Sequence, residues 1–519
     1  MRVGTAPTVE NERRRTSSAS RTATRRDATL RAERRVLPMT PRWVAIILAA
    51  GQGTRMQSRL AKVAHPLAGR PIVRHVIECA RAAGVDDCVV DVGAGPDADA
   101  VRAAAGDDVR FVVQAEPLGT GDAVACAREA TAAADHVLIL NGDVPLVLPS
   151  SLRRLMRALS EPDADTTAPV GFVPLSSEAT TSAAIPDLAL LTARVPVEAY
   201  GVLELAGHHV TRIVETKGAE GVDRADVRYI NSGQYAVRAS WLWSRLDRIA
   251  PAPNGERYLT LLAAMAHDEG NPGVAVEAED PAEVRGINDR IQLAEAEATL
   301  RRRILRAHML NGVTVIDPPS TYIDAGVTVG ADTTIAPQTH LLGRTAIGAN
   351  CQIGPGTLIR DSTIGDRCEV RFSMVEESTL ENDIDVGPYS HLRPGSYISE
   401  GVHIGNFAEV KASRLGKRTK MGHFSYLGDA QVGDDVNIGA GTITANYDGA
   451  NKHETIIGDG AFIGSDTMLV APVRIGAGAR TGAGSVVNRD VPDGMTAIGA
   501  PARIRAPQAA GQQEEPGSG

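Results

Sequence analysis

Two stretches of this 519-residue chain combine side chains that could act on phosphate groups. The first is a glycine-rich loop after an apolar run, Leu48-Ala-Ala-Gly-Gln-Gly-Thr-Arg-Met56. Such loops point backbone N–H groups at phosphate oxygens, and Arg55 would add a cationic fork. Lys62 is a candidate second cation, with a solvated loop lysine as the alternative. The spacing matches neither the dinucleotide fingerprint nor the P-loop of kinases, which argues against both classes.

A carboxylate follows a second apolar run, in the segment Asn141-Gly-Asp143. Ligands of open α/β sheets bind at the carboxyl ends of strands, and Mg²⁺ prefers one or two carboxylates together with substrate phosphates. Asp143 is therefore a candidate Mg²⁺ ligand, and capping of the next helix is the alternative. Asn288 offers an amide oxygen at the start of a long helical segment, where capping competes in the same way.

The second stretch lies in the C-terminal half, where the chain repeats every six residues and eighteen residues make one coil. Arg393 and Lys411 are eighteen residues apart, so we expect them to stack on one face. Two stacked cations suit a sugar phosphate. His423 lies twelve residues beyond Lys411 and therefore on another side. It is the residue that could exchange a proton near neutral pH, although an isolated histidine in a strand is usually structural.

The elements that would position these side chains fall into two classes. Small aliphatic residues recur every six positions from Ile323 to Val487, often followed by Gly. This period predicts a parallel β-helix of about nine coils, with the aliphatic side chains inside a triangular prism. Thr442 to Thr455 breaks the phase and is predicted to project as a loop. Flat prism walls in this class of protein often associate as trimers, so we expect a homotrimer, although the spacing itself does not show it.

The preceding half alternates strand-like and helix-like segments. Apolar runs predict strands at 44–48, 87–92, 111–114 and 136–140, and amphipathic patterns predict helices at 71–84 and 122–134. This alternation predicts a mostly parallel sheet of Rossmann-like α/β type. A long helix is predicted for Asp289 to Leu310, ending at the C-cap sequence Asn311-Gly312, and we interpret it as the strut between two domains.

Composition narrows the class of protein further. The net charge of −9 argues against nucleic acid as a partner. No apolar run approaches the ~18 residues that a membrane-spanning helix needs, so we expect no stable membrane insertion. The five Cys are dispersed without a CxxC motif, which is typical of inert thiols in a reducing compartment. We therefore expect a cytoplasmic protein without a cysteine-based metal site.

Residues 1–40 differ from the rest of the chain. They hold ten Arg against four acidic residues and lack hydrophobic periodicity, which predicts disorder. The composition also resembles an organelle transit peptide, but we favour a dispensable tail or a start site placed too early, since Met39 precedes the first strand. No apolar core of a secretion signal follows the charges.

The order of the motifs along the chain also resembles that of a known protein family. Motifs like those of bacterial sugar-nucleotide pyrophosphorylases occur at 48–56, 62, 114–121, 141–145, 200–201, 213–217, 229–233 and 286–290. Combined with the hexapeptide half, residues 43–505 resemble the family of bifunctional N-acetylglucosamine-1-phosphate uridylyltransferases and glucosamine-1-phosphate acetyltransferases. The resemblance implies UTP and acetyl-CoA as co-substrates, Mg²⁺ as cofactor and UDP-N-acetylglucosamine, a precursor for the cell wall, as product.

The same resemblance divides the chain into five parts. They are an Arg-rich tail (1–40), a nucleotidyltransferase domain (43–288), a linker helix (289–311), a left-handed β-helix acetyltransferase domain (312–505) and a second disordered tail (506–519).

For the N-terminal site, the resemblance implies that Asp143 and Asn288 hold Mg²⁺, while Arg55 and Lys62 neutralise charge as the sugar phosphate attacks the α-phosphorus of UTP. The residues implied to bind UTP and UDP-N-acetylglucosamine are Leu48, Ala49, Ala50, Gly51, Lys62, Gln114, Gly119, Thr120, Gly201, Glu215, Asn231 and Asn288. The chain departs from the residues usual in the family at Asp122 (usually His), Val202 (Arg), Gly218 (Asp) and Leu261 (Asp).

For the C-terminal site, the resemblance implies that His423 is the general base that draws a proton from the glucosamine amine. The residues implied to hold the sugar phosphate are Arg393, Lys411, Tyr426, Asn437 and Lys452. Those implied to bind acetyl-CoA are Ala440, Asn446, Tyr447, Ser465 and Ala483.

Two alternatives stay open at this point. The departures in the N-terminal half are compatible with an acetyltransferase whose nucleotidyltransferase domain is weakened or redirected to another sugar phosphate or nucleotide. The other alternative is a non-enzymatic regulatory or assembly subunit. The intact Asp143, Asn288 and Lys62 argue against that second alternative, as does His423 with its neighbouring cations.

Overall fold

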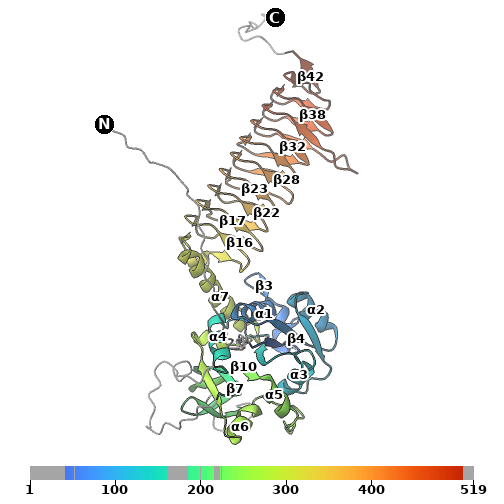
Figure 1. Cartoon of the computed structure of the whole chain (residues 1–519). Coiled ribbons are helices and arrows are strands. Elements are labelled where there is room, and N and C mark those ends of the chain that lie inside the picture. The colour runs from blue at the N-terminus through green and yellow to red at the C-terminus, as the bar shows by residue number, and fades with distance from the viewer. Residues whose placement is uncertain are drawn as a thin grey trace, which may run out of the picture. The chain divides into compact units, whose positions relative to one another are not determined.

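The computed structural model describes residues 41–51, 53–160, 185–198, 200–215, 223 and 225–506. The predictions made for the tail 1–40, for the tail 506–519 beyond its first residue and for Gly218 concern residues outside these ranges. An α/β half is followed by a long stack of short strands (Figure 1). Within the described ranges, no helix is both long and apolar enough to cross a membrane.

The described residues of the α/β half form a nine-stranded sheet in the order β5-β4-β1-β6-β10-β7-β11-β9-β8. Its strands are β1 (Trp43–Leu48), β4 (Asp87–Gly93), β5 (Arg110–Gln114), β6 (His136–Asn141), β7 (Leu188–Pro196), β8 (Val202–Ala206), β9 (His209–Val214), β10 (Val227–Arg238) and β11 (Gly273–Glu277). The strands β5, β4, β1 and β6 pair in parallel, as predicted. Beyond them the sheet is mixed, because β10 runs antiparallel to both β6 and β7.

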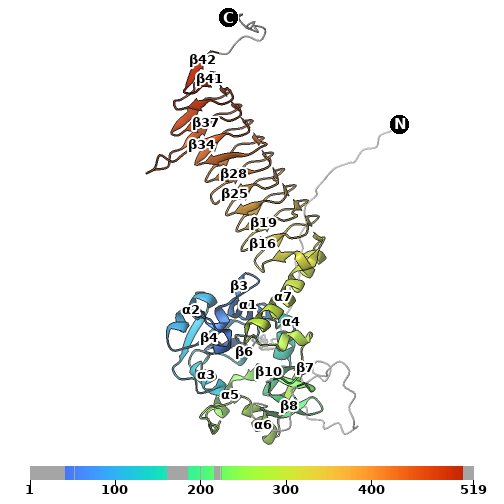
Figure 2. The ribbon, with the colours of Figure 1, turned by 180° about the vertical axis from the view of Figure 1, so that it is seen from behind.

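Helices cover both faces of this sheet (Figure 2). Buried residues of α1 (Ile72–Ala83), α2 (Pro96–Ala105) and α4 (Pro149–Arg157) pack in the core on one face. Those of α3 (Thr120–Cys126), α5 (Ala239–Leu246) and α6 (Leu261–Asp268) pack on the other. The predicted helix at 71–84 is confirmed as α1, which ends at Gly84 with φ 103°, a conformation that favours glycine.

The helix predicted for 122–134 is wrong in its extent, because α3 ends at Cys126. The chain continues to Ala134 through turns closed by hydrogen bonds between residues three apart, such as Arg128 N to Ala125 O at 3.1 Å. The Thr131 hydroxyl donates to the carbonyls of Ala127 and Arg128 at 2.8 and 3.2 Å. Such side-chain bonds compete with the regular helical pattern.

Three sheets of twelve, ten and nine strands form the prism in the fully described range 312–506, and they are parallel except that the last strand, β42, runs antiparallel to β41. Its strands run from β12 (Thr314–Val315) to β42 (Ala502–Arg505). Successive coils pair with a shift of mostly 17 or 18 residues, so Leu392 of β25 (His391–Leu392) pairs with Val410 of β28 (Ala408–Lys411). This register confirms the predicted β-helix.

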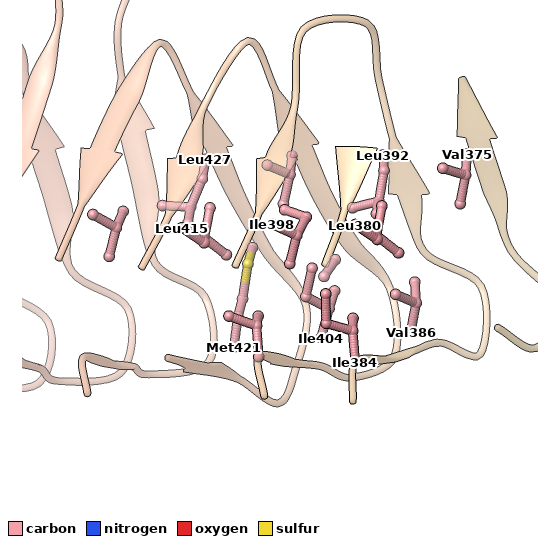
Figure 3. Packing of buried hydrophobic residues seen from close by; sticks show 14 of the residues in the cluster. Val375, Leu380, Ile384, Val386, Leu392, Ile398, Ile404, Leu415, Met421 and Leu427 are labelled. Carbon is pink, nitrogen blue, oxygen red and sulfur yellow. The ribbon is translucent and has the colours of Figure 1, made fainter. Parts of the chain in front are cut away.

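Inward-pointing aliphatic side chains fill the prism (Figure 3). Leu380, Ile398 and Leu415 occupy equivalent positions in consecutive coils and are at most 1% exposed. Full burial of such a side chain contributes about 1.5–3 kcal/mol to the free energy of unfolding, so the stack holds the coils together without aromatic residues.

The predicted strut is α7 (Arg290–Leu310), which begins after the N-cap Asp289 and ends at Asn311. Its residue Ala296 belongs to a small cluster with Leu67 and Ile72, whereas Leu305 belongs to the core of the prism. One helix therefore contributes to the cores of both halves.

A segment that leaves the repeat follows β34 (Ile443–Ala445) and precedes β35 (Thr455–Ile457). It projects beyond the coils in Figure 1, and within it Tyr447 pairs with Lys452 in an antiparallel bridge. The predicted loop is confirmed, with Thr442 and Thr455 at its ends belonging to the coils themselves.

Candidate active sites

The glycine-rich loop folds back against Lys62. It leads from β1 into a short 3-10 helix, Thr54–Met56, and Gly53 precedes that helix with φ 60°. A Cβ atom added at Gly53 would lie 2.5 Å from the Cβ of Lys62, closer than real Cβ contacts. Glycine at this position therefore allows the loop carrying Arg55 and the segment carrying Lys62 to approach each other.

Four predicted site residues meet beside this loop. The Lys62 ammonium forms an ion pair with Asp143 and lies 3.3 Å from Asn288 Oδ1. Arg55 donates to the same Asn288 oxygen at 2.9 Å. Asp143 follows β6 and Asn288 precedes α7, so the carboxyl end of one strand and the N-terminus of one helix converge on one point. The predicted proximity of Asp143 to Asn288 is confirmed, although 144 residues separate them in the sequence.

This geometry fits a divalent cation that also binds phosphate. Two oxygens of different residues, one carboxylate and one amide, converge on a single positive group, Lys62 Nζ. Among the described residues no group of three or more His, Cys, Asp or Glu side chains could hold a metal alone. Mg²⁺ binds through one or two carboxylates plus substrate phosphates, which matches a donor set that is incomplete without substrate.

Two adjoining cavities of about 380 and 290 Å³ open beside these residues. They share Leu48, Thr120, Asn141, Asp143 and Tyr258. The predicted residues that line the larger cavity are Leu48, Ala49, Ala50, Gly51, Lys62, Gln114, Gly119 and Thr120. Those that line the smaller one include Gly201, Glu215, Asn231 and Asn288. The structure thus brings together, in one double cavity, the N-terminal residues predicted to bind substrate.

Several residues of this double cavity were not predicted. Asn141 and Tyr258 line both parts, and the Tyr200 hydroxyl accepts a hydrogen bond from Gly286 N at 3.2 Å. Burial raises the pKa of Tyr200. Asp91 of β4 belongs to the wall of the larger cavity. A carboxylate inside the apolar run 88–92 could have indicated Asp91 from the sequence.

The phosphate-binding cations predicted in the prism gather at the end of one sheet. Lys411 pairs in register with Gly428 of β31 (Ser425–Gly428), and Arg393 follows the strand before it. Arg393 forms an ion pair with Glu409 at 2.8 Å, and Lys411 lies 3.5 Å from Asp429. The predicted stacking of Arg393 on Lys411 agrees with the pairing of Leu392 with Val410.

The projecting loop reaches the same place. The neighbouring Lys411 side chain lowers the pKa of Lys452, so the two ammonium groups lie close together. Asn446 donates to Asp429 at 2.5 Å, and Tyr447 donates to Gly449 O at 2.6 Å within the loop. Asp429 thus joins Lys411 to the loop. The sequence could have indicated that Asp429 lies near Lys411, because Asp429 follows it by eighteen residues, about one coil.

His423 lies on a different edge of the prism, at the corner that follows β30 (Lys420–Met421) and precedes β31. Its side chain is exposed. Between each two successive coils, the strands on both sides of this corner pair with the same shift, which is 17, then 25, then 18 residues. That register places four predicted residues one above another on this edge: His423, Ala440, Ser465 and Ala483. A line of small residues therefore begins directly beside the imidazole.

One chain does not bring the imidazole to the cations. His423 is five residues before Gly428, the partner of Lys411 in the sheet, which corresponds to about 16 Å of extended strand. Tyr426 lies on that strand between them, whereas Asn437 of β33 (Asn437–Ile438) belongs to the neighbouring sheet. The cations and His423 thus lie at the two ends of one face.

Comparisons with known proteins cover both halves. Residues 45–194 match the family model described as MobA-like NTP transferase domain, and residues 326–361 and 454–489 match bacterial transferase hexapeptide repeats. The protein named bifunctional protein GlmU from Brevibacillus brevis is 43% identical over 463 residues, 88% of this chain and 94% of that protein. Those of Pelobacter propionicus and Heliobacterium modesticaldum are 46% and 45% identical, again over 88% of this chain and 95% and 94% of theirs. The chain therefore belongs to the family of bifunctional GlmU proteins, which combine a nucleotidyltransferase domain with a left-handed β-helix.

Proposed function

We propose that this protein makes UDP-N-acetylglucosamine in two reactions at two separate sites. Glucosamine-1-phosphate is first acetylated by acetyl-CoA in the β-helix (312–505). The product then attacks UTP in the α/β domain (43–288), which releases pyrophosphate, and 289–311 links the two domains. One observation carries the proposal: the double cavity with the cluster of Lys62, Asp143 and Asn288 is distinct from the histidine edge of the prism.

Uridylyl transfer needs positioning and charge neutralisation more than a covalent catalyst. Asp143 and Asn288 would hold Mg²⁺, which when bound supplies positive charge to the phosphates. Arg55 and Lys62 add fixed cations beside them, so the negative charge that develops on the released pyrophosphate is stabilised by the protein. Gln114, Gly119 and Thr120 would contact the base. Gly201, Glu215 and Asn231 line the second cavity, where the sugar would lie.

The acetylation requires a free amine. His423 would take a proton from the glucosamine amine as the nitrogen attacks the thioester carbonyl of acetyl-CoA, and the C–S bond then breaks with coenzyme A as the leaving group. Arg393, Lys411 and Lys452 would bind the phosphate, with Tyr426 and Asn437 completing the sugar site. The pantetheine arm would follow the small residues Ala440, Ser465 and Ala483, covered by Asn446 and Tyr447 of the loop.

A second subunit completes this site. Since His423 and Lys411 lie at opposite ends of one face, the imidazole of one copy would meet the cations of its neighbour. A closed ring of three copies satisfies this arrangement with identical contacts, because three flat prism walls can face one another about a threefold axis. We therefore propose a homotrimer that associates through the β-helix.

Paired variants test the two assignments in the full-length protein. Asp143→Asn should abolish pyrophosphate release from UTP and N-acetylglucosamine-1-phosphate while sparing acetylation. His423→Ala should lower acetyl-CoA-dependent consumption of glucosamine-1-phosphate by about 10²–10⁴-fold, the usual contribution of a general base, while sparing uridylyl transfer. Each variant serves as the folding control for the other. Variants that both behave as wild type in both assays would refute the site assignments.

A further inference from the structure

Gln114 is held in one orientation at the wall of the larger cavity. Its Nε2 donates to Gly119 O at 3.1 Å and to Asp122 Oδ2 at 3.0 Å. A carbonyl oxygen can only accept, so the nitrogen of the Gln114 amide must face Gly119 and Asp122. Both of its N–H groups are then used, and Oε1 is left as a hydrogen-bond acceptor. Gln114 is 6% exposed, so this orientation cannot relax freely into solvent.

A second carboxyl group, that of Asp91, lies close enough to Asp122 to feel its charge. Asp91 is fully buried, and neither of its carboxyl oxygens has a hydrogen-bond partner in the part of the chain that the structure describes. Val89, which lies two residues earlier on the same face of β4, is also fully buried. An unpartnered carboxylate in such surroundings is costly, so a neutral carboxylic acid is the stable form.

The surroundings of Asp91 agree with this protonation state. Burial, followed by the nearby charge of Asp122, raises the pKa of Asp91 to about 8, and only the backbone amide of Gln114 opposes the shift. The Cys126 thiol of α3 also interacts with Asp91, and burial raises the pKa of that thiol. On the neighbouring strand β1, the residue paired with Asp91 is the apolar Leu48. Asp91 is therefore neutral at pH 7.

We propose that Asp122, backed by a neutral Asp91, is a positioning residue that presents Gln114 Oε1 as an acceptor to the nucleobase and thereby selects uracil over cytosine. Uracil carries a hydrogen on N3 and would donate to Oε1. Cytosine carries a lone pair at N3, which would repel the same oxygen. This inference rests on the proposed function, because it assumes that the base of UTP lies beside Gln114.

The arrangement has a consequence above pH 8. There Asp91 loses its proton and places a buried negative charge close to Asp122. The repulsion disfavours the position of Asp122 that holds Gln114. The KM for UTP should therefore rise between pH 7 and pH 9, with little change in kcat, because the phosphates and the attacking sugar are bound elsewhere.

The experiment compares Asp122→Ala, Asp122→Asn and Asp91→Asn in the full-length protein, with UTP and CTP as alternative substrates. Asp122→Ala should raise the KM for UTP about tenfold, as expected for loss of one hydrogen bond to a charged group, and reduce the preference for UTP over CTP by a similar factor. Asp122→Asn retains an acceptor for Gln114 and should restore most of the preference. Asp91→Asn should abolish the rise in KM above pH 8.

Glu129→Gln is the matched control, because it removes one carboxylate from an exposed position in the turns that follow α3. Acetyltransferase activity of each preparation monitors folding. Wild-type UTP preference in Asp122→Ala, or a change confined to kcat, would overturn the inference, as would an unchanged pH profile in Asp91→Asn. Failure of the wild-type protein to release pyrophosphate from UTP would instead refute the proposed function itself.

Discussion

At the scale of single residues, the α/β site is organised by charges that compensate one another. Lys62 is 13% exposed and Asp143 21% exposed, so the ion pair between them is largely shielded from water. Removing one partner from such a pair leaves an uncompensated charge, which is strongly unfavourable. The ammonium of Lys62 thus keeps the Asp143 carboxylate neutralised and oriented in the protein without substrate, at the point where the phosphates would bind.

Asp91 makes the stability of the α/β domain depend on pH. Its pKa of about 8 in the folded protein exceeds the ordinary value of 3.8. Between these pH values the folded state holds a proton that the unfolded state has lost, so the free energy of unfolding should fall with rising pH by about 1.4 kcal/mol per pH unit from this group. Below pH 4 and above pH 8, Asp91 should not make the free energy of unfolding depend on pH.

Urea unfolding followed by tryptophan fluorescence measures this effect. The three Trp of the chain, Trp43, Trp241 and Trp243, all lie in the α/β half. Asp91→Asn should flatten the dependence between pH 5 and pH 8, because it removes the titrating group and keeps the shape. The same slope in wild type and Asp91→Asn would show that Asp91 is ionised in the folded protein.

At the scale of elements, the prism derives its stability from short strands that each bury one side chain. In β20 (Thr363–Ile364), Thr363 is exposed and Ile364 is 2% exposed. Ile364→Ala should lower the free energy of unfolding of the prism by about 2–5 kcal/mol, through lost burial and the cavity left behind. Far-UV circular dichroism in urea measures the transition.

Thr363→Ala is the matched control in the same strand and should change the free energy of unfolding by no more than about 0.5 kcal/mol. The tryptophan signal provides a second control, because it reports on the α/β half. A loss of the same size in both variants would contradict the assignment of Ile364 to the interior of the prism.

At the scale of the whole molecule, the proposed acetyltransferase site depends on more than one subunit. His423→Ala and Lys411→Ala should each be inactive in acetylation when pure. Co-expressed in equal amounts, they should regain about a quarter of wild-type activity, because three-quarters of random trimers are mixed and each mixed ring has one intact site of three. The measurement is acetyl-CoA-dependent consumption of glucosamine-1-phosphate per trimer.

The control for this mixture is co-expression of two other single variants, Lys411→Ala and Arg393→Ala. Both cations lie on the same chain, so no ring of these two variants contains an intact site, and no activity should return. An inactive mixture of His423→Ala with Lys411→Ala would place the imidazole and the cations in one subunit and refute the shared site.

Much of the architecture was determined by the sequence alone, since it depends on local and periodic features. The six-residue repeat predicts the prism and the stacking of Arg393 on Lys411, because every coil repeats the geometry of the one before it. The loop containing Arg55 and the segment ending in Asp143 are likewise local, since each follows a single strand. The resemblance to known families depends on the order of such motifs.

Only the tertiary structure decided which distant groups meet and which do not. It brings Asn288 close to Asp143, makes β10 run antiparallel to β6, and ends α3 at Cys126. It also buries Asp91 close to Asp122 and Gln114, and these three residues belong to three different elements. Their protonation and orientation follow from desolvation and from the few partners that packing leaves within reach. Those quantities depend on long-range packing, which no local sequence pattern encodes.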